Sequence, residues 1–131
     1  MNQLENIYKH DLMDHARNPR NYGLKQDCPL RSVRHNPSCG DVVQICGYVD
    51  QESIKQLFFE ASGCVLSKAM ASKLTEYVAG KDFEQILSFD EKTVEKLLNM
   101  ELGINRLQCG MLSVLALQQA IVEYRSLKKN A

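Results

Sequence analysis

Residues 41–61 read DVVQICGYVD-QES-IKQLFFEA, and they contain two apolar segments separated by a short polar turn. Both segments, 41–50 and 54–61, are rich in valine, isoleucine and phenylalanine, which are typical of strands. Cys46 lies on the face opposite to the alternating apolar residues of the first segment. The pattern predicts an antiparallel hairpin in which Cys46 is a small packed residue rather than a ligand.

The elements on either side of this hairpin are predicted from the period of their apolar residues. Residues 3–17 carry apolar side chains at helical spacing, and residues 31–35 fit a short strand. After Gly63 the period changes from two to about 3.6 residues. This change predicts a helix that starts near Cys64 and is closed by Gly80.

The rest of the chain is predicted to be helical. Short helices are expected over about 83–87 and 91–99, and a long last helix over about 106–127. The expected N-terminal caps are Asp82 with Gln85, Ser88 with Glu91, and Asn105. Together the elements predict an α+β fold, a small three-stranded antiparallel sheet packed with helices, in a single domain over residues 1–131.

Composition and charge exclude several classes of function. The 131 residues include sixteen basic and sixteen acidic side chains, so the chain has no net charge that would attract nucleic acid or an anionic membrane. No secretory signal and no apolar stretch of membrane-spanning length is present. Five cysteines in such a chain predict free thiols in a reducing, cytoplasmic compartment.

Candidate chemistry begins at the loop before the hairpin, residues 36–41 (NPSCGD), where Cys39 and Asp41 are two positions apart. Pro37 fixes one backbone angle and Gly40 permits a conformation closed to other residues, so the loop can aim both side chains at one point. The hexapeptide alone fits an ordinary turn with a buried thiol equally well.

Two further cysteines occupy comparable positions, Cys64 directly after a glycine at a helix start and Cys109 near the start of the last helix. A helix N-terminus stabilises a thiolate, which is both the metal ligand and the sulfur nucleophile. The separations between Cys39, Cys64 and Cys109, 25 and 45 residues, match no compact metal motif. If the fold brings the three thiolates together, Asp41 is the natural oxygen donor for a fourth position.

The remaining cysteines and histidines are expected to have structural roles. Cys28, in a loop, is expected to be packed. His10 and His15, on the first helix, are expected to be solvated or packed. His35, next to the first cysteine motif, could supply a stray nitrogen ligand, although a plain loop residue is the simpler interpretation.

The ordered motifs resemble those of a known family, the iron–sulfur cluster assembly scaffolds of the IscU, SufU and NifU N-terminal type. The similar stretches are NPSCGD at 36–41, GCVLSKAMAS at 63–72, RLQC at 106–109 and DHARNPRNYG at 14–23. The resemblance implies a scaffold that holds a transient [2Fe-2S] cluster, or zinc, on Cys39, Asp41, Cys64 and Cys109. It also implies that Asp41 keeps the site labile, that a cysteine desulfurase delivers persulfide sulfur first to Cys109, and that recipient apoproteins receive the cluster.

The sequence also departs from the family pattern. IscU-type members have a histidine before the third cysteine and a Leu-Pro-Pro-Val-Lys tract that an Hsp70-type chaperone reads; here these positions carry Gln108 and residues 102–106, LGINR. The resemblance therefore gives no basis for such a chaperone, and the site would depend more heavily on Asp41. Arg106 resembles the residue that members of the SufU branch have at this position. That branch, however, has a lysine at the position of Gln108, and it has an additional segment between the second and third cysteines that is absent here.

Two alternatives to the scaffold remain. The first is a zinc-binding sulfurtransferase that accepts persulfide and stimulates the desulfurase. The second is a structural zinc module without sulfur chemistry, which a chelator would unfold.

Overall fold

The computed structural model describes residues 3–38 and 40–129 and contains one three-stranded antiparallel sheet. Its strands are β1 (Leu30–Asn36), β2 (Asp41–Asp50) and β3 (Ser53–Ser62), in the order β1-β2-β3. The helices are α1 (Gln3–Arg17), α2 (Val65–Tyr77), α3 (Phe83–Leu87), α4 (Glu91–Leu98) and α5 (Ile104–Lys129). The predicted α+β fold and its long C-terminal helix are confirmed.

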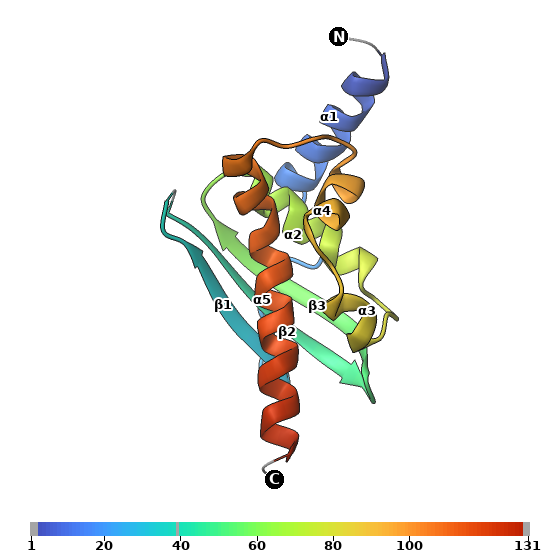
Figure 1. Ribbon diagram of the computed structural model, residues 1–131, viewed down its shortest axis with the longest axis vertical. Coiled ribbons are helices and arrows are strands. Elements are labelled where there is room, and N and C mark those ends of the chain that lie inside the picture. Colours follow the sequence, from blue (N-terminus) through green and yellow to red (C-terminus); the bar gives the residue numbers. More distant parts are fainter. Residues whose placement is uncertain (1–2, 39, 130–131) are drawn as a thin grey trace.

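The core lies between one face of the sheet and the helices α2 and α5. α5 crosses β1 and β2, and α2 lies against β3 and α5 (Figure 1). Apolar side chains from all three strands and both helices fill the space between them: Leu30, Val43, Ile45, Phe59, Met70, Leu74, Leu117 and Ile121. Burial of these side chains is the main stabilising contribution to this packing.

The loop after α1 pairs with the free edge of β3 and then passes over the opposite face of the sheet, which explains the burial of Cys46. The backbone N–H of Gly23 donates to the Phe59 carbonyl at 2.8 Å, and that of Lys25 donates to Cys46 Sγ at 3.2 Å. Cys46 and Cys28 are both buried, as predicted. Desolvation raises the pKa of the Cys46 thiol to about 11, so this thiol is a poor nucleophile.

The structure corrects the predicted N-cap of α4 and the predicted C-cap of α2. The box of Asp82 and Gln85 is present, but α4 is capped by Asp90 with Thr93 rather than by Ser88 with Glu91. The C-cap of α2 is Val78, two residues before the predicted Gly80. Gly80 has a left-handed φ of 85° and donates its N–H to the Ile54 carbonyl at 2.8 Å, so it belongs to the connection after the helix.

The start of α5 also differs from the prediction. The helix begins at Ile104, and the Leu107 N–H bonds the Gly103 carbonyl at 2.9 Å, so Asn105 lies inside the helix and is not its N-cap. Cys109 is consequently the sixth residue of α5 rather than a first-turn residue. The helix dipole therefore acts on this thiol less strongly than expected, because its effect fades beyond the first turn.

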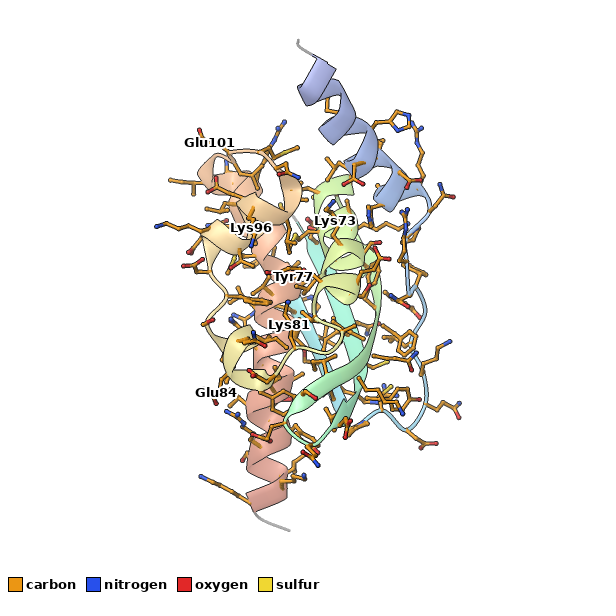
Figure 2. All side chains as sticks on the ribbon, turned by 90° about the vertical axis from the view of Figure 1, so that its right-hand side faces the viewer. Lys73, Tyr77, Lys81, Glu84, Lys96 and Glu101 are labelled. Carbon is orange, nitrogen blue, oxygen red and sulfur yellow. The ribbon has the colours of Figure 1, made fainter. Side chains whose placement is uncertain are left out.

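The α3–α4 segment closes one side of the core against α2 and α5. The Tyr77 ring packs on Phe89 with centroids 5.6 Å apart, and Lys81 Nζ lies 4.4 Å from the Tyr77 centroid (Figure 2). Gln118 Nε2 on α5 donates to the carbonyls of Ile86 and Phe89 at 3.1 and 3.0 Å. These contacts hold α5 in place along its middle.

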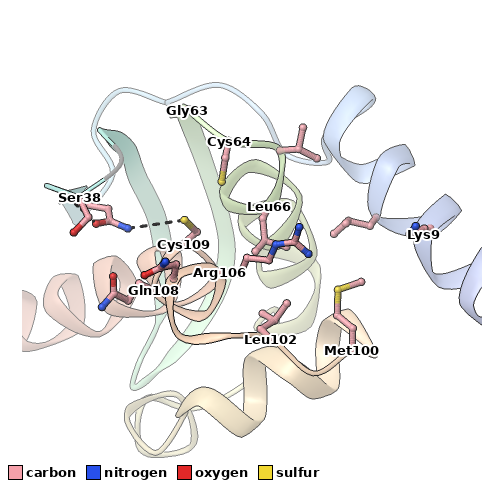
Figure 3. A pocket seen from close by; sticks show the side chains of 14 residues that line it. Lys9, Ser38, Gly63, Cys64, Leu66, Met100, Leu102, Arg106, Gln108 and Cys109 are labelled. Atoms are coloured by element: carbon pink, nitrogen blue, oxygen red, sulfur yellow. Dashed lines mark hydrogen bonds between the residues drawn. The ribbon is translucent and has the colours of Figure 1, made fainter.

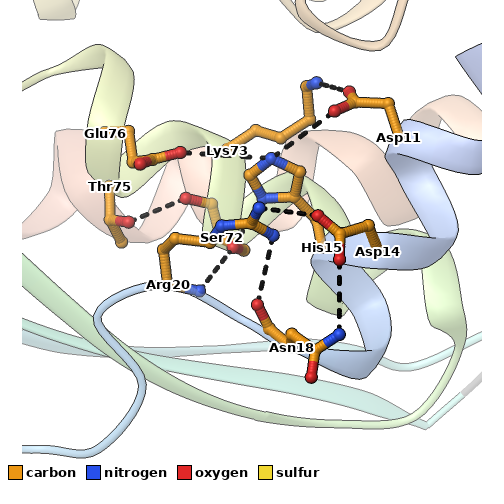
Figure 4. Close-up of polar contacts among 9 residues, drawn as sticks. All are labelled: Asp11, Asp14, His15, Asn18, Arg20, Ser72, Lys73, Thr75 and Glu76. Atoms are coloured by element: carbon orange, nitrogen blue, oxygen red, sulfur yellow. Dashed lines mark hydrogen bonds and ion pairs between the residues drawn. The ribbon is translucent and has the colours of Figure 1, made fainter.

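A buried histidine joins α1 to α2. His15 Nδ1 lies 2.8 Å from Ser72 Oγ, which also accepts the Arg20 N–H at 2.8 Å (Figure 4). His15 Nε2 lies 3.9 Å from an Asp11 oxygen and 4.0 Å from a Glu76 oxygen. Burial, followed by the nearby Arg20 and Lys73 charges, lowers the pKa of His15 below 6.5 despite those carboxylates.

This histidine makes folding stability depend on pH. Below about pH 6.5 the unfolded chain protonates His15 while the folded protein still holds it neutral, so the free energy of unfolding falls as the pH drops. Urea unfolding between about pH 7.5 and 5.5 measures the effect. His15→Gln is expected to lose part of the pH dependence, whereas His10→Gln, which changes an exposed residue of the same helix, should retain it. Equal pH dependence in wild type and His15→Gln would contradict this role.

Within the described ranges, none of the helices combines the length and apolar character needed to cross a bilayer.

Candidate metal centre

Three chain segments meet at one end of the sheet. They are the β1–β2 turn, the junction between β3 and α2, and the N-terminal part of α5 (Figure 1). The antiparallel register pairs Asn36 with Asp41 and Val42 with Ser62. The start of β2 therefore lies beside the residues that lead into α2.

Asp41, Cys64 and Cys109 come together at this point. One ligand atom from each, a carboxylate oxygen and two Sγ atoms, lies within 4.8 Å of the others. The predicted grouping of these three residues is thus present. Cys39 lies outside the described residues, and His35 is exposed and outside this group.

Asp41 is buried, with 2% of its surface exposed, and each carboxylate oxygen accepts a hydrogen bond. The Cys64 backbone N–H donates to Oδ1 at 2.9 Å, and the Ser67 hydroxyl donates to Oδ2 at 2.6 Å. Both donors belong to the beginning of α2, where the helix dipole also favours negative charge. The carboxylate is therefore held beside the two sulfurs, and neither of these two hydrogen bonds comes from a cationic side chain.

A close backbone approach makes this placement of Asp41 possible. Gly63 has a φ of +122°, and a Cβ added there would lie 2.0 Å from Asp41 Oδ1. Glycine is required both for the backbone angle and for the space. The glycine before the cysteine is thus explained by contact with the carboxylate.

Cys64 is the N-cap of α2, which confirms its predicted place at a helix start. Its Sγ accepts the Ser67 backbone N–H at 3.5 Å and lies 3.4 Å from the Ser67 hydroxyl. The Cys64 side chain thus meets one of the backbone N–H groups that the first turn of α2 leaves without a helical partner. Cys64 and Cys109 are both partly exposed.

Cys109 is approached from the loop side by Asn36. The Asn36 amide Nδ2 lies 3.9 Å from Cys109 Sγ, and Asn36 is itself buried (Figure 3). Its Oδ1 accepts the Ser38 N–H at 3.1 Å and its carbonyl accepts the Gly40 N–H at 2.8 Å. Asn36 thus connects the β1–β2 loop to the sulfur on α5.

Two residues of this site had no role in the sequence analysis. Ser67 and Asn36 hydrogen-bond to the candidate ligands Asp41 and Cys109, respectively, which are distant from them in sequence. A partial signal existed for Ser67, because a hydroxyl residue three positions after an N-cap can reach back to the cap. No local pattern indicated the contact between Asn36 and Cys109.

A cleft of about 880 Å³ opens beside the two cysteines (Figure 3). Its apolar wall includes Leu12, Leu66, Met100 and Leu102, from α1, α2 and the connection between α4 and α5. Lys9, Arg106 and Gln108 also line it. Both cysteines can therefore be reached from solvent through this cleft.

Comparisons with known proteins agree with this architecture. The family model "NifU-like N terminal domain" matches residues 7–131. The chain is 30% identical to the zinc-dependent sulfurtransferase SufU of Bacillus subtilis, over 92% of each chain. It is 33% identical to the iron-sulfur cluster assembly scaffold protein IscU 1 of Archaeoglobus fulgidus, over 90% of this chain and 76% of that one.

A solved structure shows the same fold. The N-terminal part of a nitrogen-fixing NifU-like protein from Brucella abortus superposes with a TM-score of 0.72 at 17% identity, covering 99% of this chain and 100% of the other.

Proposed function

Because the chain belongs to the NifU-like N-terminal domain family, whose model matches residues 7–131, we propose that it is a scaffold for iron–sulfur cluster assembly. It receives iron and sulfur, holds a transient [2Fe-2S] cluster as cargo and passes it to recipient apoproteins. The observation that carries the proposal is the convergence of Asp41, Cys64 and Cys109 within 4.8 Å. Relatives named as cluster assembly scaffolds support it.

The proposed ligand set is Cys39, Cys64, Cys109 and Asp41. Thiolates suit iron–sulfur clusters and zinc alike, and zinc would use the same four donors. Cys39 is included because its loop begins at Asn36, which contacts Cys109, and ends at Asp41. A hard carboxylate among soft sulfurs favours a centre that can be released.

Sulfur is proposed to arrive on Cys109 from a cysteine desulfurase. The Cys109 thiolate attacks the outer sulfur of the donor's persulfide, a new S–S bond forms on Cys109, and the donor cysteine leaves as a thiolate. The cleft beside Cys109 provides the access that this transfer needs. The scaffold itself turns over no small substrate.

The proposal extends to the organisation and location of the chain. Residues 1–131 act as one scaffold domain. Cys28, Cys46 and Cys64 are free thiols, which suits a reducing compartment such as the cytoplasm.

A zinc-dependent sulfurtransferase is the second candidate. The SufU relative, which is 30% identical, favours it. Gln108 favours it as well, because the amide next to the third cysteine is a poor metal ligand. In this alternative the protein accepts persulfide and stimulates the desulfurase while it binds only zinc.

Anaerobic reconstitution distinguishes the two. The protein is incubated with ferrous iron, cysteine and a desulfurase, and then assayed for bound iron, bound sulfide and visible charge-transfer absorption. A coloured product with matching iron and sulfide supports the scaffold. A colourless protein that carries persulfide and zinc supports the sulfurtransferase, and one with neither would overturn both.

Asp41→Ala is expected to lengthen the lifetime of the bound cluster several-fold. The change removes the exchangeable oxygen ligand, whose detachment would open the centre to solvent, together with its charge. The decay of charge-transfer absorption after transfer to aerobic buffer measures the lifetime. Asp50→Ala, which changes an exposed carboxylate at the far end of β2, should decay at the wild-type rate. Decay of Asp41→Ala as fast as wild type would count against this role.

A further inference from the structure

One buried hydroxyl connects three parts of the metal centre. Ser67 is 1% exposed, and its Oγ lies 2.6 Å from Asp41 Oδ2, 3.4 Å from Cys64 Sγ and 3.3 Å from the Cys109 carbonyl oxygen. In the part of the chain that the structure describes, no other side chain hydrogen-bonds to all three residues. Ser67 is thus placed to respond to a change at any of them.

The hydroxyl has one proton and can fully donate to only one of these acceptors at a time. The 2.6 Å contact with a carboxylate is charge-assisted and the shortest of the three. The contacts with sulfur and with the carbonyl are longer and weaker. The arrangement in the structure is therefore one in which Ser67 holds Asp41.

We propose that Ser67 is a positioning residue for release, which holds the Asp41 carboxylate whenever that carboxylate leaves the metal. While Asp41 ligates the metal, the hydroxyl turns to Cys64 Sγ or to the Cys109 carbonyl. When Asp41 detaches, it regains the stronger hydrogen bond from Ser67 beside the one from the Cys64 N–H. This rests on the proposed function in one respect, that Asp41, Cys64 and Cys109 share a metal.

Removal of the Ser67 hydroxyl destabilises the state with Asp41 detached more than the state with Asp41 on the metal. The detached state loses a charge-assisted hydrogen bond, whereas the ligated state loses only a weaker contact. Asp41 then remains on the metal for a larger fraction of the time. The metal is therefore released more slowly, by about tenfold for a difference of this kind.

Zinc release provides the test, because it needs neither desulfurase nor cluster assembly. Zinc-loaded protein is mixed with an excess of a coloured chelator, and the release rate is followed by absorbance. Ser67→Ala is expected to release zinc about tenfold more slowly than wild type. Ser113→Ala is the matched control, since Ser113 is equally buried and its hydroxyl has no hydrogen-bond partner among the described residues; it should release zinc at the wild-type rate.

Two comparisons separate this role from a structural one. The effect of Ser67→Ala should vanish in an Asp41→Ala background, because Ser67 acts through that carboxylate. Ser67→Thr, which keeps the hydroxyl, should restore the wild-type rate. The proposal is overturned if Ser67→Ala releases zinc as fast as wild type or faster. It is also overturned if Ser67→Ala slows zinc release equally in an Asp41→Ala background.

A measurement on the wild-type chain keeps the test decisive if the Ser67 variants fail to fold. Infrared difference spectra between zinc-loaded and zinc-free protein should show one carboxylate moving from a metal-bound to a hydrogen-bonded frequency, a signal absent in Asp41→Ala. Absence of that signal in wild type that binds zinc overturns the Ser67 role alone. A wild-type protein that binds no zinc overturns the shared metal site and this role with it, whatever cluster reconstitution shows.

Discussion

Gly63→Ala is expected to destabilise the protein by about 3 kcal/mol and to weaken its metal centre. A Cβ at this position would lie 2.0 Å from Asp41 Oδ1 and 2.9 Å from the Asp41 Cα, so both a side chain and a backbone would have to move. The φ of +122° adds backbone strain for any residue other than glycine. Displacement of Asp41 also breaks its hydrogen bond from the Cys64 N–H, which positions the carboxylate.

Gly80→Ala is the matched control for Gly63→Ala. Gly80 also has a positive φ, +85°, but a Cβ there would have no heavy atom within 4 Å. Gly80→Ala therefore strains the backbone as Gly63→Ala does, but its new Cβ collides with no described atom. Urea unfolding measures stability, and competition with a zinc chelator measures affinity. Equal losses in the two variants would show that the contact with Asp41 contributes nothing.

The hairpin register explains why part of the site was predictable. Asp41 begins β2 and Ser62 ends β3, and the pairing of Val42 with Ser62 places Asp41 next to Gly63 and Cys64. The apolar alternation in residues 41–61 was sufficient to predict that hairpin. The proximity of Asp41 and Cys64 follows from it, because strands that pair from a short turn must bring their far ends together.

The position of Cys109 did not follow from local pattern. It depends on how α5 packs across β1 and β2, which is a tertiary contact between segments more than 50 residues apart. The start of α5 was also missed, because Ile104 is 77% exposed and lies outside any apolar stripe. Asn105 is a favoured cap residue, but propensity for a cap is a weak signal when the preceding residues can also be helical.

The wrong prediction for the N-cap of α4 is explained by two neighbouring residues that can both cap a helix. Ser88 and Asp90 are both good N-cap residues, two positions apart, and each has a partner three residues later. In the structure Asp90 accepts from the Lys92 and Thr93 N–H groups, while the Ser88 hydroxyl donates to the Gln85 carbonyl at the end of α3. Sequence alone could not decide which residue ends one helix and which begins the next.

Cys109→Ala is expected to abolish sulfur acceptance and to lower zinc affinity by at least about a hundredfold. Loss of a residue that only supports a ligand typically costs ten- to a hundredfold, so loss of a proposed ligand should cost more. Cluster reconstitution should likewise give a colourless product. Mass spectrometry after mixing with desulfurase and cysteine detects the persulfide, and chelator competition measures zinc affinity.

The control for Cys109→Ala is Cys28→Ala, which removes a buried thiol outside the Asp41–Cys64–Cys109 group. It should keep wild-type zinc affinity and persulfide loading. If Cys109→Ala still acquires persulfide while losing zinc, Cys109 is a ligand but not the first acceptor. Sulfur would then enter at Cys64, whose Sγ already accepts the Ser67 N–H at the start of α2, or at Cys39. Cys64 lines the same cleft as Cys109, so the same partner surface would deliver sulfur to a different residue.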